Sequence, residues 1–338
     1  MSKDKKRQIS LAKLDRLVRL ALQRAGMSEA NAAPVANRMV SCERDAVKGH
    51  GLLRLDGFVT SLRLGWADGK VEPKVIAETP SLLCVDAGSG FVQVVLERFR
   101  ERLIVRARDT GIAILQIRNS HHFSALWPDL EPFATEGLVA YACVNSKKRM
   151  AAWDEGRAVL GTNAMAFAVP RKDALPMIWD QSSSVVSQGD ILHAARGGDE
   201  VPAGVGVDSE GRPTTDPAAI LDGGALLPFG GPKGASLAVM VEILAAGLSG
   251  GEFGFQDASP GQTATTSRGG YFLLLIDPSK STPDFLERME LFYSALTNAG
   301  SERLPGERRY AARKASLEKG VWLESDMFAK LLELAGET

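Results

Sequence analysis

Residues 111–127 read "GIAILQIRNSHHFSALW", an apolar run followed at once by polar and aromatic side chains. The apolar run predicts a buried strand, and the residues after it predict a loop. Strand ends that lead into loops are common places for ligand contacts in proteins that mix helices with strands. Neighbouring residues of an extended chain point to opposite sides. We therefore expect one of His121 and His122 to face a site and the other the core, with burial of both as the alternative.

Other short segments with strand character lie on both sides of this stretch, separated by glycine and proline. They are "SLLCVDA" (81–87), "LVAYACVN" (138–145), "AMAFAVP" (164–170), "PMIWDQS" (176–182) and "YFLLLID" (271–277). Helical patterns cover residues 10–25, 28–44, 283–298 and 307–336, a further one starts near residue 58, and the apolar segment 235–250 predicts a central core helix. Ser10 and Ser28 can cap the first two helices. This order predicts a mixed α/β fold.

The bulk composition is that of an ordinary globular protein. The chain has 338 residues, of which 45% are hydrophobic and 24% charged, and this length suits roughly two domains. A net charge of −1 gives no reason to expect a nucleic-acid partner or an anionic membrane surface. No apolar run is long enough to span a bilayer, and no signal-peptide core follows the charged start. Three scattered cysteines predict buried thiols rather than a disulfide scaffold or a zinc site, so we expect a cytoplasmic protein.

Several common motifs do not occur in the sequence. There is no GxGxxG fingerprint, no GxxxxGK[ST] loop, no HExxH, no paired CxxC and no GxSxG elbow. A standard Rossmann cofactor domain and a P-loop nucleotide site are therefore not indicated, and we expect no metal centre.

The stretch "ERDAVKGHGLLRL" (43–55) places a histidine between two glycines, with an arginine four residues later. If this stretch is helical, His50 and Arg54 lie on one face. An imidazole can deliver a proton near neutral pH, and a guanidinium can hold a carboxylate with two hydrogen bonds. The alternative is a helix end at which His50 acts as a cap.

Three further segments each allow two interpretations. Asp190, in "SVVSQGDILHAARGG" (184–198), could cap a helix or orient an imidazole. Lys233, in "LPFGGPKGAS" (227–236), lies where a helix N-terminus could receive an anion. Arg308 and Arg309, in "RLPGERRY" (303–310), could meet a phosphate or coat the surface.

Five stretches, taken in order, resemble the type-2 malate/lactate dehydrogenase family. They are "ERDAVKGHGLLRLDGFVTSLRLGW" (43–66), "RNSHHFSALWPDLEPFATEGLVAYACVNS" (118–146), "LGTNAMAFAVP" (160–170), "ALLPFGGPKGASLAVMVEILAAGLSGG" (225–251) and "ERLPGERRY" (302–310). The resemblance runs from about residue 10 to 335. The segments "HHFSALWPD" and "ILDGGALLPFGG" are most similar to its Δ1-piperideine-2-carboxylate/Δ1-pyrroline-2-carboxylate reductase branch.

The resemblance implies a non-Rossmann NAD(P)-binding fold with a largely antiparallel sheet, flanked by helices from both chain ends. It implies three parts: residues 1–75, packing with 305–338; a central α/β domain of 76–118 and 232–304; and an NADP-binding sheet domain of 119–231. Family members form homodimers, so we expect one here.

The activity implied is hydride transfer from NADPH, in preference to NADH, to the C=N bond of a small cyclic imine 2-carboxylate. The products would be L-pipecolate or L-proline. One alternative is an NAD(P)-dependent 2-hydroxyacid dehydrogenase of the malate, lactate or ureidoglycolate type. The other is a nucleotide-binding relative with reduced or lost turnover.

The resemblance also assigns roles to individual residues. His50 falls on the proton donor, Asp190 on the aspartate that orients it, Arg54 on the substrate-carboxylate arginine, and Thr162 on a substrate or nicotinamide contact. Cofactor contacts fall on His122, Phe123, Ser124, Ala125, Leu126, Asp180, Gln181, Ser182, Pro305, Gly306, Glu307, Arg308 and Arg309.

The chain departs from the family pattern at several positions. Gly49 stands where the family usually has a serine that completes the relay to the histidine. The segment "NSKKRMAAWDEG" (145–156) is more basic than the apolar run expected there, so Lys147, Lys148 and Arg149 either favour a more acidic substrate or face solvent. "DQSSS" (180–184) and Pro232 are also unusual. These departures indicate a divergent member whose substrate could be shifted.

Overall fold

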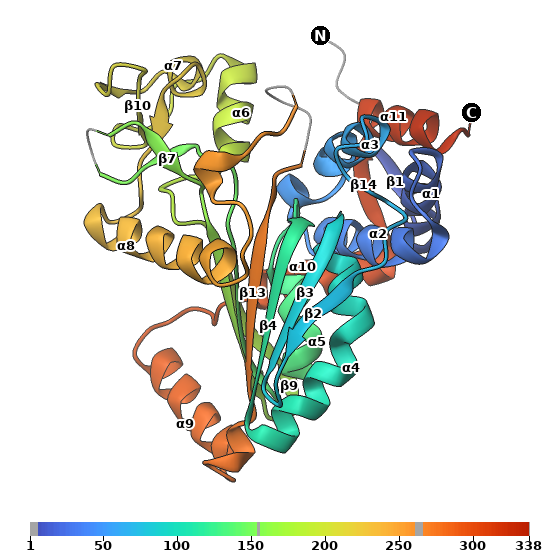
Figure 1. Ribbon diagram of the computed structural model, residues 1–338, viewed down its shortest axis with the longest axis vertical. Coiled ribbons are helices and arrows are strands. Elements are labelled where there is room, and N and C mark those ends of the chain that lie inside the picture. The colour runs from blue at the N-terminus through green and yellow to red at the C-terminus, as the bar shows by residue number, and fades with distance from the viewer. Residues whose placement is uncertain (1–5, 154–155, 261–265, 338) are drawn as a thin grey trace.

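The computed structural model describes residues 6–153, 156–260 and 266–337, and a seven-stranded sheet runs through its centre (Figure 1). The strand order is β2 (Lys74–Glu78), β3 (Leu82–Phe91), β4 (Ile112–His121), β13 (Arg268–Ile276), β5 (Val139–Val144), β8 (Ala164–Arg171) and β9 (Ala174–Gln181). Within the described ranges, β3 and β4 are its one parallel pair, and every other neighbouring pair is antiparallel. The prediction of a mixed α/β fold with a largely antiparallel sheet is confirmed.

Both faces of the central strands of this sheet are covered, which explains their continuous apolar sequences, whereas the edge strand β2 is exposed. Ala113, Leu115 and Ile117 of β4 point to one face and are fully buried against α4 (Val92–Thr110) and α5 (Trp127–Thr135). On the other face, β13 and β5 pack against α8 (Pro232–Val241) and the π-helical turn η3 (Glu242–Gly247). The sheet is therefore an internal layer, and its strand ends are the places where side chains reach a cavity.

The two chain ends pack together beside the sheet (Figure 1). Helices α1 (Leu11–Arg24), α2 (Glu29–Arg44) and α3 (Leu55–Arg63) share an apolar cluster with α11 (Ser325–Ala335). Strand β1 (Lys6–Ile9) pairs with β14 (Val321–Glu324) in the same region. Ser10 and Ser28 cap α1 and α2 as expected, each accepting a backbone N–H.

A smaller lobe is built on five short strands, and it lies at the upper end of the sheet, on the side opposite the helices of the two chain ends (Figure 1). The order is β11 (Pro213–Thr214), β10 (Gly206–Val207), β12 (Ala225–Leu226), β6 (Met150–Ala151) and β7 (Ala158–Leu160). Helices α6 (Gln188–Gly197) and α7 (Pro217–Leu221) complete its core. The division of the chain into three domains stays a prediction. Strands of its second and third parts lie side by side in the seven-stranded sheet.

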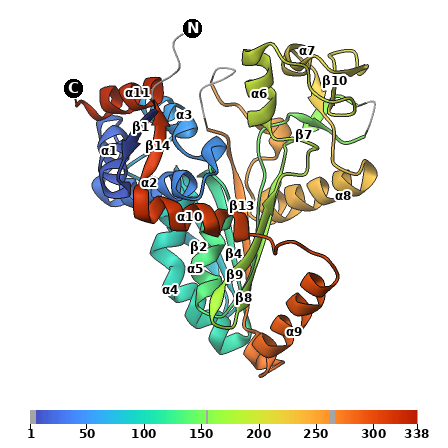
Figure 2. The same cartoon turned by 180° about the vertical axis from the view of Figure 1, so that it is seen from behind.

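Several predicted helices differ from those observed. The segment 235–250 is not wholly buried, because Ile243 and Leu248 are 53% and 54% exposed. The helical pattern predicted over 307–336 is interrupted, since α10 (Glu307–Lys319) ends at Gly320 with φ +73°, and β14 separates it from α11. The third helix begins at Leu55 rather than near residue 58. Figure 2 shows α10 crossing from the sheet to the N-terminal helices, with α9 (Phe285–Asn298) below it.

Gly270 lies at an irregularity in the register of β13, directly below η3. A Cβ at this position would overlap the backbone carbonyl of Ala245, which the helix holds in place. We therefore expect Gly270→Ala to lower the free energy of unfolding by about 1–3 kcal/mol, the usual cost of overpacking a core. Denaturant unfolding would measure this. Gly49→Ala, where a Cβ meets no atom within 4 Å, is the control. Equal stability of the two variants would contradict the expectation.

Candidate active site

A cavity of about 700 Å³ lies where the strand ends of the large sheet meet α6 and the loop after α2. Small-molecule sites commonly have this size. Its wall includes residues that were predicted for the site from segments far apart in the chain: His50, Arg54, Ser124, Ala125, Thr162, Asp180, Gln181, Ser182, Asp190, Arg308 and Arg309. The fold thus brings these side chains together. Lys233 is exposed and is not among the residues that line this cavity.

His50 and Arg54 do not lie on one α-helix, as their spacing suggested. Two 3-10 turns, η1 (Lys48–His50) and η2 (Leu52–Arg54), are separated at Gly51, whose φ and ψ of −92° and −130° are not helical. The cause is Glu43, which is buried and accepts the Leu52 N–H at 2.8 Å. A Cβ at Gly51 would overlap this carboxylate, so the glycine permits the turn. His50 makes no side-chain cap.

Arg54 is held on two sides. Its Nε donates to the Gly49 carbonyl at 2.8 Å, and its guanidinium lies 4.5 Å from the centre of the Phe123 ring. Among the described residues it has no carboxylate partner, so its other N–H groups are available to a ligand. Burial and the charge of Arg149 lower the pKa of Arg54. The arrangement is that of a fixed guanidinium prepared for an anion.

His50 is half-buried beside this guanidinium. Burial, Arg54 and His122 lower the pKa of His50 to about 4, and the Asp190 carboxylate opposes them. The imidazole of the ligand-free protein is therefore neutral at pH 7. A carboxylate bound at Arg54 would cancel one of the charges that lower this pKa.

Asp190 caps α6 by means of a capping box. Its Oδ2 accepts from the Ser187 N–H at 3.1 Å and from the Ser187 hydroxyl at 2.7 Å. No hydrogen bond joins it to His50 within the part of the chain that is described, although its charge acts on the imidazole. The capping alternative is observed, and the orienting role stays a prediction.

The two neighbouring histidines are both buried, so the expected division between site and core is wrong. His121 Nδ1 lies 2.7 Å from the Thr266 hydroxyl, in the core. His122 Nε2 lies 2.9 Å from the Asp129 carboxylate, and its side chain is 2% exposed.

Asp180 has a structural contact in addition to its place in the cavity wall. Its Oδ2 accepts the backbone N–H groups of Leu126 and Trp127 at 2.8 and 2.9 Å, at the start of α5. Of the predicted segment 122–126, only Ser124 and Ala125 line the cavity. His122, Phe123 and Leu126 are not among the residues that line it.

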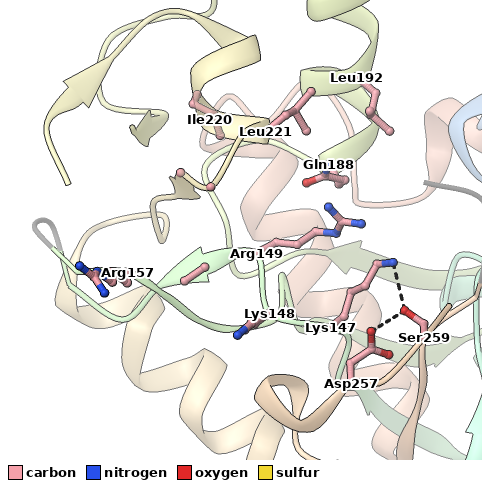
Figure 3. Close-up of a pocket in the computed structure, with 13 residues that line it drawn as sticks. Lys147, Lys148, Arg149, Arg157, Gln188, Leu192, Ile220, Leu221, Asp257 and Ser259 are labelled. Carbon is pink, nitrogen blue, oxygen red and sulfur yellow. Dashed lines mark hydrogen bonds between the residues drawn. The ribbon is translucent and has the colours of Figure 1, made fainter. Parts of the chain in front are cut away.

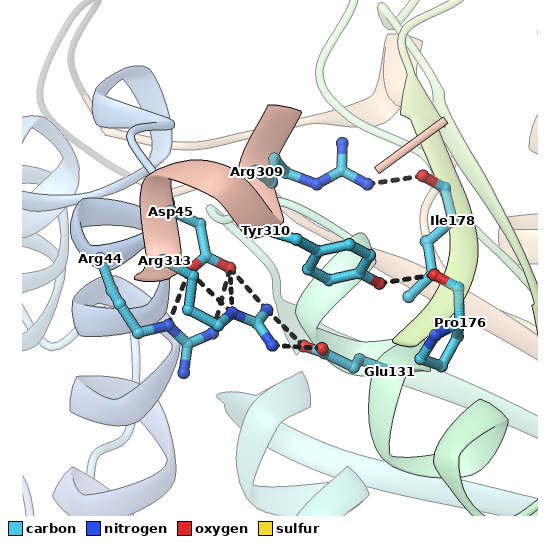
Figure 4. Close-up of polar contacts among 8 residues, drawn as sticks. All are labelled: Arg44, Asp45, Glu131, Pro176, Ile178, Arg309, Tyr310 and Arg313. Atoms are coloured by element: carbon cyan, nitrogen blue, oxygen red, sulfur yellow. Dashed lines mark hydrogen bonds and ion pairs between the residues drawn. The ribbon is translucent and has the colours of Figure 1, made fainter. Parts of the chain in front are cut away.

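The start of α10 is clamped to strand β9 and to the N-terminal helices (Figure 4). Arg309 donates to the Ile178 carbonyl, and the Tyr310 hydroxyl donates to the Pro176 carbonyl, both at 2.6 Å. Arg313 forms ion pairs with Asp45 and Glu131. Pro305, Gly306 and Glu307 shape this turn and are not part of the cavity wall.

The cavity wall contains donors that suit a phosphate-bearing ligand. Trp127 Nε1 and Arg309 Nε are buried, and within the described residues neither has a hydrogen-bond partner. The exposed Arg308 lies beside them. Buried donors without a partner are rare in folded proteins and fit ligand oxygens. These residues therefore fit the nicotinamide nucleotide that the resemblance implies. Sequence reasoning missed Trp127, whose position in "HHFSALW" was the available signal.

In the described part of the chain, no group of three or more histidine, cysteine or acidic side chains is placed to hold a metal ion. The same residues include no helix with the length and apolar character needed to cross a membrane.

Comparison with known proteins supports the resemblance. Residues 9–332 match the family described as malate/L-lactate dehydrogenase. A relative from Pseudomonas putida, named Delta(1)-pyrroline-2-carboxylate/Delta(1)-piperideine-2-carboxylate reductase, is 43% identical over 97% of each chain. The (2R)-3-sulfolactate dehydrogenase (NADP(+)) of Chromohalobacter salexigens is 38% identical over 94% of each. The crystal structure of delta1-piperideine-2-carboxylate reductase from Pseudomonas syringae pv. tomato superposes with a TM-score of 0.94 at 43% identity, covering 97% of this chain and 99% of that one.

Proposed function

The chain belongs to the malate/L-lactate dehydrogenase family, and we propose that it reduces the C=N bond of small cyclic imine 2-carboxylates with NADPH. Δ1-piperideine-2-carboxylate would give L-pipecolate, and Δ1-pyrroline-2-carboxylate would give L-proline. The observation that carries the proposal is one cavity in which a half-buried imidazole stands beside a guanidinium without a carboxylate partner among the described residues. The identity to the Pseudomonas reductases supports the choice of substrate.

In the proposed mechanism, Arg54 binds the substrate carboxylate and Phe123 keeps the guanidinium in place. His50 supplies the proton that the imine nitrogen needs, and Asp190 stabilises the charged imidazole by its nearby carboxylate. A bound nicotinamide supplies the hydride for the imine carbon. The protein's own contribution is position and charge.

Binding of the substrate also prepares the proton donor. The carboxylate cancels the charge of Arg54, which is one of the causes of the low pKa of His50. The pKa of His50 should therefore rise in the complex, so that the imidazole carries a proton where one is needed.

We further propose that Thr162, Gln181 and Ser182 contact the nicotinamide end of the complex, and that Trp127, Arg308 and Arg309 contact phosphate groups. The preference for NADPH over NADH, a homodimer, a cytoplasmic location and a role in amino-acid metabolism belong to the same proposal. The NADP-dependent relative from Chromohalobacter supports the choice of cofactor.

A 2-hydroxyacid dehydrogenase is the second candidate, because the same guanidinium and imidazole could act on a 2-oxo acid and the sulfolactate enzyme is 38% identical. Loss of NADPH absorbance with the two imines, beside pyruvate and oxaloacetate, separates the candidates. Faster turnover of the imines supports the proposal, and faster turnover of the oxo acids overturns it.

A Gly49→Ser variant tests whether catalysis needs the serine that the family usually has at this position. A Cβ here meets no atom within 4 Å, so a serine fits without displacing a neighbour. We expect Gly49→Ser to change kcat by less than about threefold, the scale of a substitution that adds no essential contact. Steady-state kinetics with Δ1-piperideine-2-carboxylate would measure this. A large gain in rate would instead indicate that the natural chain has lost activity through this glycine.

A further inference from the structure

A second cavity, of about 650 Å³, adjoins the candidate active site (Figure 3). Residues 147–149 form one wall, α6 and α7 form another, and Asp257 and Ser259 close a third. Gln188, at the start of α6, lines both cavities. A ligand in the first cavity could therefore extend into the second.

Two of the four cations of this cavity converge, and two do not. In Figure 3 the side chains of Lys147 and Arg149 point in the same direction, and Gln188 lines the same cavity. Lys148 and Arg157 point away from them. The basic segment seen in the sequence is thus divided, with Lys147 and Arg149 inside and Lys148 exposed.

The positive charge of Lys147 and Arg149 is poorly compensated. Among the described residues neither forms an ion pair, and Lys147 Nζ has only a long contact, 3.5 Å, with the Ser259 hydroxyl. That hydroxyl donates to Asp257 at 2.6 Å, and the single negative charge of Asp257 acts on both cations without forming an ion pair with either. Burial lowers the pKa of both cations, the charge of Arg149 lowers that of Lys147 further, and the Asp257 carboxylate opposes these effects in both. Half-buried cations that form no ion pair favour the binding of an anion.

The charge of Arg149 also reaches Arg54, whose pKa it lowers. A substrate with one carboxylate would neutralise Arg54 and leave the two positive charges of Lys147 and Arg149 facing the single negative charge of Asp257. A substrate with a second anionic group could neutralise both positions.

We propose that Lys147, Arg149 and Gln188 bind a second carboxylate of the substrate, so that the preferred substrate is a cyclic imine dicarboxylate. This inference rests on the proposed reductase function, and it names the substrate class of the same site.

Binding can be tested without turnover. Pyridine-2-carboxylate and the 2,4-, 2,5- and 2,6-dicarboxylates of pyridine are planar analogues of the imine ring. In titration calorimetry with the full chain and NADPH, at least one dicarboxylate should bind about tenfold or more tightly than pyridine-2-carboxylate. A gain of this size corresponds to one additional charge-assisted hydrogen bond. Arg149→Gln and Lys147→Gln should abolish this advantage, and Arg149→Lys should keep part of it.

Lys148→Gln is the matched control, because it removes the same charge from the neighbouring exposed position and should keep the advantage. Equal affinity for mono- and dicarboxylates in the natural chain would overturn the inference. A selective loss of NADPH affinity, relative to NADH, in Arg149→Gln would assign the pocket to a nucleotide phosphate and overturn it as well. Turnover of Δ1-piperideine-2-carboxylate is measured in parallel. If that imine is not reduced but a pyridine dicarboxylate still binds more tightly than pyridine-2-carboxylate, the reductase proposal fails. The binding site for a second carboxylate at Lys147, Arg149 and Gln188 then stands.

Discussion

Replacing His50 with alanine is expected to lower kcat for reduction of Δ1-piperideine-2-carboxylate by about 10²–10⁴-fold, the usual contribution of a positioned proton donor. The methyl group cannot deliver a proton to the imine nitrogen, while Arg54 and Phe123 keep their contacts. KM should therefore change little. The measurement is the loss of NADPH absorbance at saturating substrate.

The pH dependence of the natural enzyme follows from the same residue. A proton donor acts in its protonated form, so kcat should fall as pH rises through the pKa of His50 in the substrate complex. That pKa should lie above the value of about 4 in the ligand-free protein, because the substrate carboxylate cancels the charge of Arg54. In His50→Ala, kcat should no longer fall with rising pH in this range.

His193→Ala is the control for the His50 variant, since His193 is exposed on α6 and is not part of the cavity wall. It should keep nearly full activity and the falling limb. If His50→Ala retained more than about a tenth of the natural rate, an effect smaller than general acid catalysis provides, another group would have to be the donor.

All strands of the large sheet except β2 could be predicted because they are short apolar runs bounded by glycine and proline. Helices α1 and α2 could be predicted because Ser10 and Ser28 cap them. The helix α4 was missed. Its buried side chains, such as Val95 and Phe99, alternate with many charged residues, so the apolar face is hidden in a strongly polar segment. The short strands of the smaller lobe consist of two or three residues each, and their pairing depends on partners far away in the chain.

The candidate site was predicted in composition rather than in geometry. The resemblance named His50, Arg54 and Asp190, and the cavity contains all three. The break at Gly51 could not be predicted, because its cause is a contact with the Glu43 side chain. The buried donors of Trp127 and Arg309 likewise become visible only when α5 and α10 meet at the cavity.

The second large effect is expected at Arg54. Arg54→Ala should lower kcat/KM by about 10²–10³-fold, chiefly by raising KM, because removing one partner of a buried charge pair commonly costs about 2–4 kcal/mol. Arg54→Lys should retain only a small part of the natural kcat/KM. An ammonium group lacks the planar, two-pronged geometry of a guanidinium and does not stack on Phe123 in the same manner. Steady-state kinetics over a range of substrate concentrations separates KM from kcat.

A pH profile separates this role from a merely structural one. The Arg54 charge lowers the pKa of His50, so its removal should raise that pKa and move the falling limb of kcat/KM to higher pH. A variant that only disturbs folding would lose activity without this displacement. Arg63→Ala, an exposed arginine in the last turn of α3, is the matched control and should leave both the rate and the profile unchanged. An unchanged KM in Arg54→Ala would mean that the substrate carboxylate binds elsewhere, and the orientation proposed for the imine ring would then be wrong.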